Sequence, residues 1–139
     1  MNLRVALPHE ADWINARYAA VQFMPSDLTR ELVVVAEIDG VAAGLGRLVP
    51  YGEVYELGGM LVFEEFRGRG VARAIIDELL RRADRDVYCI PFADLTALYE
   101  SAGFVRANED DAPIAIREKL AWCRQTYDRA VTLLECGSA

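Results

Sequence analysis

The segment over residues 54–83 constrains the fold most, because its hydrophobic period changes from that of a strand to that of a helix. Residues 54–63 are mainly apolar, which favours a strand, and the pair Gly58-Gly59 inside this stretch predicts a bulge. From Gly68 onward the apolar residues recur at helical spacing, with arginines and aspartates on the opposite side. The sequence therefore predicts a strand, a glycine-rich turn and an amphipathic helix in direct succession.

The remaining elements follow from the same kinds of signal. Asp39-Gly40 lies between two apolar runs and predicts a β-hairpin, since both residues tolerate the positive φ angles of a two-residue turn. Their order along the chain predicts an α/β (α+β) fold with a mixed sheet, in a single domain over residues 1–139. The expected strands are residues 3–6, 31–38, 41–49, 87–90, 104–106 and 131–136, and the expected helices are residues 13–21, one capped by Asp94, and one capped by Asp111 with Pro113 in its first turn.

The acidic composition argues against several classes of protein. The chain has 15 Lys and Arg against 22 Asp and Glu, whereas nucleic-acid binding needs clustered basic residues. An acidic surface favours cationic partners such as amines. The apolar stretches are far shorter than the roughly 20 residues of a membrane span, and the N-terminus lacks the pattern of a signal peptide. We therefore expect a cytoplasmic protein with no nucleic-acid or membrane partner.

Cysteine and histidine are too few and too dispersed to predict a metal site. Cys89, Cys123 and Cys136 have neither the spacing of a disulfide framework nor that of a metal-binding pair. We expect them to be reduced and mostly buried thiols. His9, the single histidine, is expected on the surface. No metal is predicted.

The glycine-rich turn at residues 67–70 is a candidate phosphate site. A helix start leaves backbone N–H groups without acceptors at the positive end of the helix dipole, and glycines let an anion approach them closely. The turn lacks the Gly-Lys-Ser/Thr ending of a P-loop, and it does not fit the dinucleotide-binding fingerprint. A purely structural role for the glycines stays open on this evidence.

Two motifs resemble those of the GNAT superfamily of N-acetyltransferases. Residues 67–72, Arg-Gly-Arg-Gly-Val-Ala, match the R/Q-x-x-G-x-G/A signature of that family. Residues 98–104, Leu-Tyr-Glu-Ser-Ala-Gly-Phe, look like its second motif. The resemblance implies a mostly antiparallel, twisted sheet of about six or seven strands flanked by helices. It also implies that strands four and five splay apart to admit the pantetheine arm of coenzyme A.

The same resemblance implies which residues hold the donor, acetyl-CoA. The backbone amides of Gly68, Gly70 and Ala72 would bind the pyrophosphate, with added charge from Arg67 and Arg69. The N–H of Met60 would face the thioester carbonyl, and Val62 would face a pantetheine amide; a main-chain donor at a developing oxyanion contributes about 3 kcal/mol. Further candidates for donor contact are Leu61, Val71 and Arg73, although Arg69 and Arg73 also fit solvated surface positions.

Two side chains are candidates for proton transfer by the resemblance. Tyr99 corresponds to the tyrosine that protonates the departing thiolate in many relatives, and a phenol suits that role. Glu56 is a candidate base for the acceptor ammonium, with Glu53, Glu31 and Asp27 in reserve. Tyr99 also fits an ordinary packed aromatic, and Glu56 fits a solvent-facing strand residue.

The sequence departs from the family pattern at two positions. Phe92 stands where relatives commonly have an Asn that contacts the donor, and Glu64 stands where a Pro usually follows the fourth strand. The implied reaction is direct transfer of an acetyl group to a primary amine in a ternary complex. The presence of Phe92 supports an alternative, a catalytically silent acyl-CoA-binding module.

The acceptor, which is an amine of a small molecule or a protein, is not identified by the sequence. The resemblance implies that its site is formed by the segments at residues 22–30 and 108–128. Trp122 and Tyr127, with the acidic residues 109–111, form a candidate cation pocket, and packing of a helix on the sheet explains the aromatic residues equally well. The last strand is expected at the sheet edge, where it would allow a homodimer to form.

Overall fold

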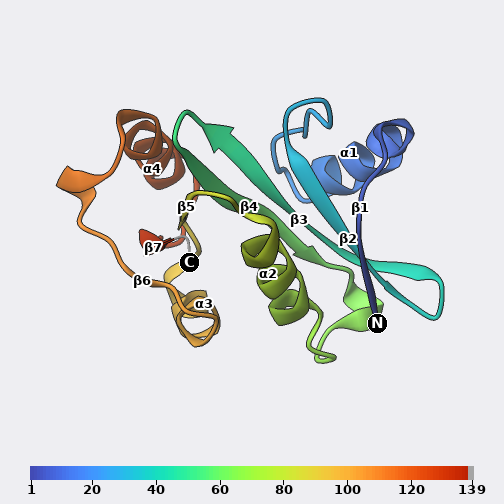
Figure 1. The fold of residues 1–139 in the computed structure, drawn as a ribbon. Helices are drawn as coiled ribbons and strands as arrows, with labels where there is room; N and C mark the ends of the chain where they lie inside the picture. Colours follow the sequence, from blue (N-terminus) through green and yellow to red (C-terminus); the bar gives the residue numbers. More distant parts are fainter. Residues whose placement is uncertain (138–139) are drawn as a thin grey trace.

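A computed structural model describes residues 1–137, which form a seven-stranded twisted sheet with helices on both faces (Figure 1). The strand order is β1-β2-β3-β4-β5-β7-β6, and every neighbouring pair is antiparallel except β4 with β5. The strands are β1 (Asn2–Val5), β2 (Leu32–Ile38), β3 (Val41–Tyr51), β4 (Val54–Val62), β5 (Asp86–Cys89), β6 (Val105–Arg106) and β7 (Leu134–Cys136), and the helices are α1 (Ala11–Ala20), α2 (Val71–Arg82), α3 (Thr96–Ser101) and α4 (Ile114–Thr126).

The predicted fold class and the predicted order of elements are confirmed. Asp39 and Gly40 close the β2–β3 hairpin with φ angles of 52° and 77°, which a type I′ turn requires. The best-patterned helix, α2, begins directly after Gly70 and buries Val71, Ile75 and Leu79.

The two faces of the sheet are covered by different helices. Alternate residues of β2 divide between them: Val33 and Val35 pack with Ile14 and Tyr18 of α1, whereas Val34 packs with α2. At the other end of the sheet α4 packs against Tyr88 of β5, and α3 lies beside α2. Helices α1 and α4 therefore share one face, and α2 and α3 share the other.

Several details at the C-terminal end correct the sequence predictions. Neither predicted helix cap is formed: Asp94 lies inside a 3₁₀ turn and pairs with Arg129, and Asp111 lies in another 3₁₀ turn ahead of α4. The last strand is shorter than predicted because Val131 makes only an isolated bridge. β7 is also not at the edge, since it pairs with both β5 and β6. The reason given for a homodimer therefore does not hold.

Candidate active site

Strands β4 and β5 pair along only part of β4. Residues 54–57 pair with residues 86–89, and this pairing does not extend along the rest of β4 within residues 1–137. Beyond β5 the chain turns away: the Thr132 N–H donates to the Pro91 carbonyl at 2.9 Å, and Phe92 bridges to Val131. The predicted divergence of the fourth and fifth strands is confirmed, and it opens the sheet.

The predicted bulge lies in β4 where the opening begins. The register with β3 shifts there, so that Gly59 and Met60 lie opposite Gly46. Gly59 has a φ of 58°, and a Cβ added to it would meet the Tyr18 hydroxyl and Arg47 Nε at 2.7 Å. The Tyr18 hydroxyl donates a hydrogen bond to the Gly59 carbonyl at 2.8 Å. The bulge therefore requires glycine and is fixed from α1.

The turn before α2 presents a run of free backbone donors. Within the described chain, no N–H over residues 68–73 donates to a protein acceptor. Gly68 and Gly70 have φ angles of 76° and 77°, and nothing lies within 4 Å of a Cβ built on either. The donors lie at the N-terminus of a 12-residue helix, where the dipole favours an anion.

Cavities connect the opening between β4 and β5 to the turn before α2, which we call the donor turn because its N–H groups are free to donate hydrogen bonds. A cavity of about 190 Å³ over the turn is lined by Gly68, Gly70 and Arg73 among others. It shares Val62, Arg67, Ala72 and Leu98 with a larger cavity of about 580 Å³. The larger cavity is lined by Tyr99 from the α2 and α3 side and by Arg47, Glu56 and Lys119 from the α1 and α4 side. The opening therefore joins the two faces of the molecule.

The family model for the acetyltransferase (GNAT) domain matches residues 29–106, more than half of the chain. The chain belongs to the GNAT acetyltransferase family. The matched segment contains β2 to β6, the donor turn and Tyr99. No match was found among curated proteins.

Solved structures of similar fold agree with this GNAT assignment. Rv2747 from Mycobacterium tuberculosis, in complex with CoA and NLQ, has a TM-score of 0.75 and 19% identity, covering 99% of both chains. A variant of spermidine N-acetyltransferase SpeG from Vibrio cholerae has a TM-score of 0.70 and 18% identity, covering 99% of this chain and 95% of its own. N-acetylglutamate synthase from Neisseria gonorrhoeae, complexed with coenzyme A and L-arginine, has a TM-score of 0.73 and 15% identity. The match to that synthase covers 98% of this chain and 32% of the synthase chain.

Tyr99 of this GNAT domain lies on α3 with its hydroxyl toward the larger cavity. Its side chain is buried and packs edge-on against Phe104, with ring centroids 5.9 Å apart. The hydroxyl makes no hydrogen bond within residues 1–137, yet no buried side-chain oxygen there lacks a partner, so the hydroxyl must reach the cavity. Burial raises the pKa of Tyr99, and the nearby Cys89 adds to the shift. The phenol therefore stays protonated at neutral pH.

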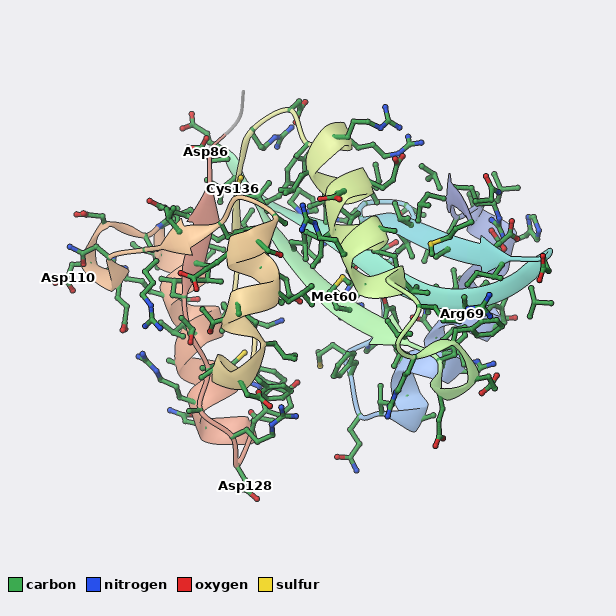
Figure 2. The ribbon with its side chains drawn as sticks, turned by 90° about the horizontal axis from the view of Figure 1, so that it is seen from below. Met60, Arg69, Asp86, Asp110, Asp128 and Cys136 are labelled. Carbon is green, nitrogen blue, oxygen red and sulfur yellow. The ribbon has the colours of Figure 1, made fainter. Side chains whose placement is uncertain are left out.

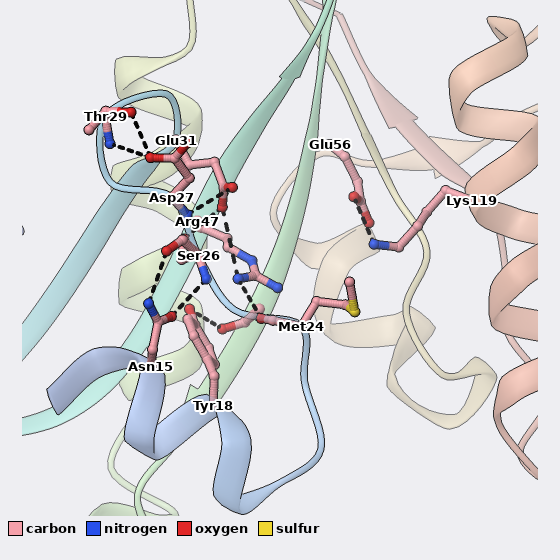
Figure 3. Close-up of polar contacts among 11 residues, drawn as sticks. Asn15, Tyr18, Met24, Ser26, Asp27, Thr29, Glu31, Arg47, Glu56 and Lys119 are labelled. Atoms are coloured by element: carbon pink, nitrogen blue, oxygen red, sulfur yellow. Dashed lines mark hydrogen bonds and ion pairs between the residues drawn. The ribbon is translucent and has the colours of Figure 1, made fainter. Parts of the chain in front are cut away.

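Glu56 lies on β4 and faces the cavity, not solvent. It is 6% exposed, and burial raises its pKa above the ordinary 4.5, while the charges of Lys119 and Arg47 oppose that shift. Lys119 of α4 approaches the carboxylate with Nζ 3.7 Å from Oε1 (Figure 3). Such a carboxyl group can take up a proton closer to neutral pH than an exposed glutamate can.

The three reserve carboxylates lie outside the cavity. Glu53 is exposed, and Asp27 is exposed and accepts hydrogen bonds from Thr29. Glu31 accepts hydrogen bonds from the Ser26 hydroxyl and the Asp27 N–H. Glu56 is therefore the one predicted base candidate that lines the cavity.

The structure brings together most of the residues predicted to hold the donor. Met60, Leu61 and Val62 line the larger cavity, and Val71 lines the smaller one. Figure 2 shows Met60 between α2 and α3, and Arg69 in the loop that leads to α2. Arg69 lines neither cavity and lies near the Phe66 ring at 5.9 Å. Arg73 lines the smaller cavity and is also paired with Asp77 and Ser101.

The predicted cation pocket differs from what the structure has. Trp122 and Tyr127 do line the larger cavity, with their rings packed edge-on at 5.8 Å. The acidic residues 109–111 do not line it, and Glu109 is paired with Arg124. The sequence prediction missed Arg47 and Lys119. The sequence alone does not show whether a charged residue of a strand or helix faces solvent or faces a cavity that several elements form together.

Phe92 lies on the cavity wall where the family commonly has Asn. Its ring packs edge-on against Tyr127 at 5.3 Å and lies under the Arg129 guanidinium at 3.8 Å. The side chain of Phe92 therefore provides an apolar wall instead of an amide.

Residues 1–137 contain no group of three or more His, Cys, Asp or Glu side chains that could hold a metal ion. In the same part of the chain no helix has the length and apolar character needed to cross a membrane.

Proposed function

We propose that the protein transfers an acetyl group from acetyl-CoA to a primary amine within a ternary complex. The observation that carries the proposal is the path from the free N–H groups over residues 68–73, through the sheet opening, to the buried carboxyl group of Glu56. Known GNAT structures in complex with coenzyme A have this fold, which supports coenzyme A as the donor carrier.

The donor would lie along the α2 and α3 side of the path. The backbone donors at the start of α2 and Arg67, which has no ion-pair partner within residues 1–137, suit a pyrophosphate. The pantetheine arm would extend beside Met60 and Val62, where β4 has lost its pairing with β5. In that position the thioester would lie between Tyr99 on one side and the bulge of β4 on the other.

Two side chains would carry the protons. Glu56 accepts one proton from the acceptor ammonium, directly or through water, which frees the nitrogen lone pair. The nitrogen then forms a bond to the thioester carbon, the carbon–sulfur bond breaks, and Tyr99 donates a proton to the sulfur. The second nitrogen proton restores the Tyr99 hydroxyl, so the products are an amide and a thiol, with one proton left on Glu56.

Phe92 supports a second candidate, an acyl-CoA-binding module without turnover. Its ring fills a place where many relatives have a polar group for the donor. Such a module would retain the free N–H groups and the cavity and would differ only in its chemistry.

Calorimetry with acetyl-CoA and a thiol-release assay over a panel of amines separate the two candidates. Donor binding together with amine-dependent thiol release supports the transferase. Donor binding with no release for any amine supports the module, and absence of donor binding rejects both. The compartment we propose is the cytoplasm, where acetyl-CoA would be accessible to the protein.

A further inference from the structure

Arg47 presents two unused donor nitrogens to the cavity beside Glu56. Its side chain is 8% exposed, and Nη1 donates to the Met24 carbonyl at 3.0 Å. Within residues 1–137 neither Nε nor Nη2 has a hydrogen-bond partner, and no buried side-chain nitrogen there is left without one. Both atoms must therefore reach the cavity that Arg47 lines.

The surroundings hold the guanidinium in this orientation. It lies 4.5 Å from the centre of the Tyr18 ring, and Glu31 approaches Nη1 at 3.9 Å (Figure 3). The loop that supplies the Met24 carbonyl is itself fixed, because Asn15 and Ser26 exchange two hydrogen bonds at 3.0 and 2.7 Å. The Nε and Nη2 edge is thus preorganised, which lowers the entropic cost of using it for binding.

Arg47 and Glu56 lie on the same face of the sheet. Arg47 of β3 pairs with Gly58 of β4, two residues from Glu56, and side chains two residues apart in a strand share a face. Such diagonal neighbours are close enough for long side chains to reach a common space. A donor fork and a proton acceptor therefore lie on neighbouring strands and line the same cavity.

Basic side chains outnumber carboxylates on the cavity wall. Arg47, Arg67, Lys119 and Arg129 line the larger cavity, whereas Glu56 is the only carboxylate that does so within the described residues. Two of these charges are already paired, Arg129 with Asp94 and Lys119 with Glu56, and Glu31 approaches only the Nη1 side of Arg47. Within residues 1–137 the Nε and Nη2 edge of Arg47 is thus left for a negative group of the acceptor.

We infer that the acceptor is an amine that carries a carboxylate a few bonds from its nitrogen, as a free amino acid does, and that Arg47 selects it. The Nε and Nη2 donors form a planar fork that matches the two oxygens of a carboxylate. With the carboxylate on this fork, the amine faces Glu56 and the opening where the thioester would lie. The apolar part of the acceptor lies against Phe23 and the Trp122–Tyr127 pair. The inference rests on the proposed function, because it names the acceptor of that same transfer.

The test compares matched acceptors with the unaltered protein in a thiol-release assay. L-phenylalanine, L-leucine and L-lysine are each assayed beside their carboxamide and their decarboxylated amine, and spermidine is included. The amide has a less basic nitrogen than the amino acid and the decarboxylated amine a more basic one. Poor turnover of both analogues therefore cannot result from basicity. For at least one of the three sets we expect kcat/KM to be about 100-fold higher for the amino acid than for either analogue, the scale of a lost charge pair.

Variants of Arg47 assign the preference to this side chain. Arg47→Gln should raise KM for the amino acid more than it lowers kcat, and should reduce the preference over the amide about 10-fold or more. Arg47→Lys keeps the charge without the planar fork and should restore only part of the preference. Arg30→Gln removes a charge from an exposed residue that does not line the cavity, and should leave the preference unchanged.

Calorimetry with coenzyme A on each protein distinguishes failure of the proposed function from failure of the carboxylate inference. Absence of coenzyme A binding by the unaltered protein would reject the proposed function itself. Intact coenzyme A binding, with turnover of spermidine or decarboxylated amines at rates equal to or above those of the amino acids, overturns the carboxylate inference alone. Intact binding with no turnover of any of the three amino acids overturns it as well. The unaltered protein is sufficient for these outcomes, even if an Arg47 variant does not fold.

Discussion

Replacing Gly70 by alanine separates binding of coenzyme A from the stability of the helix start. Gly70 is the N-cap of α2 with a φ of 77°, and it lines the smaller cavity. Gly52 is a matched control, since it has a φ of 63° in the β3–β4 turn, and nothing lies within 4 Å of a Cβ built on either glycine. Both substitutions therefore add the same backbone strain and no clash with protein.

The expected stability loss is similar for both variants. A left-handed conformation costs an L-residue about 1–2 kcal/mol, so Gly70→Ala and Gly52→Ala should each lower the free energy of unfolding by that amount. The effects on binding should differ. A methyl group over the free N–H groups keeps a phosphate oxygen from at least one of them, and a hydrogen bond to a charged group is worth about 1.5–3 kcal/mol. Only Gly70→Ala should therefore raise the Kd for coenzyme A, by about 10- to 150-fold.

Urea unfolding measures the first quantity, and calorimetry with coenzyme A on the folded variants measures the second. If Gly70→Ala binds coenzyme A as tightly as Gly52→Ala does, the turn before α2 is not the pyrophosphate site. A much larger stability loss in Gly70→Ala than in the control would show that the added methyl group clashes with protein atoms around residue 70.

Three further predictions concern the bulge and the two proton-carrying groups. Gly59→Ala combines a left-handed φ with contacts of 2.7 Å, so urea unfolding should show a loss of about 2–4 kcal/mol, and a loss equal to that of Gly52→Ala would contradict the packing. Tyr99→Phe should lower kcat about 10- to 1,000-fold with unchanged affinity for acetyl-CoA, and undiminished turnover at all pH values would exclude Tyr99 as the acid. Because burial raises the pKa of Glu56, kcat/KM should fall with decreasing pH at a point above 4.5. Lys119 lowers that pKa, so Lys119→Met should move the acidic limb to higher pH, and a shift to lower pH would exclude Glu56 as the base.

The fold was predictable because the sequence signals were local. The hairpin at Asp39-Gly40, the bulge at Gly59 and the start of α2 each follow from the conformations that a few adjacent residues permit. The proposed coenzyme A side of the cavity comes largely from one continuous segment, from β4 to α2, and its individual contacts were implied by the family resemblance.

The acceptor side was predicted only in part, because it is assembled from distant segments: Glu56 was a candidate, but Arg47 and Lys119 were missed. Arg47, Glu56 and Lys119 come from β3, β4 and α4, and only the folded chain brings them together. The caps predicted at Asp94 and Asp111 are not formed, since Asp94 pairs with Arg129 and 3₁₀ turns precede both helices, which begin two residues after Asp94 and three residues after Asp111. Acidic residues near a helix start predicted the helix but not its first residue.

The gap between β4 and β5 has a consequence for how substitutions act. A continuous sheet separates its two faces, whereas the opening between β4 and β5 connects them. Under the proposed function, substitutions on α1 or α4 would change the surroundings of the acceptor and leave the coenzyme A site at the start of α2 as it is. A protein of this architecture could therefore change its acceptor specificity while it keeps the same acyl donor.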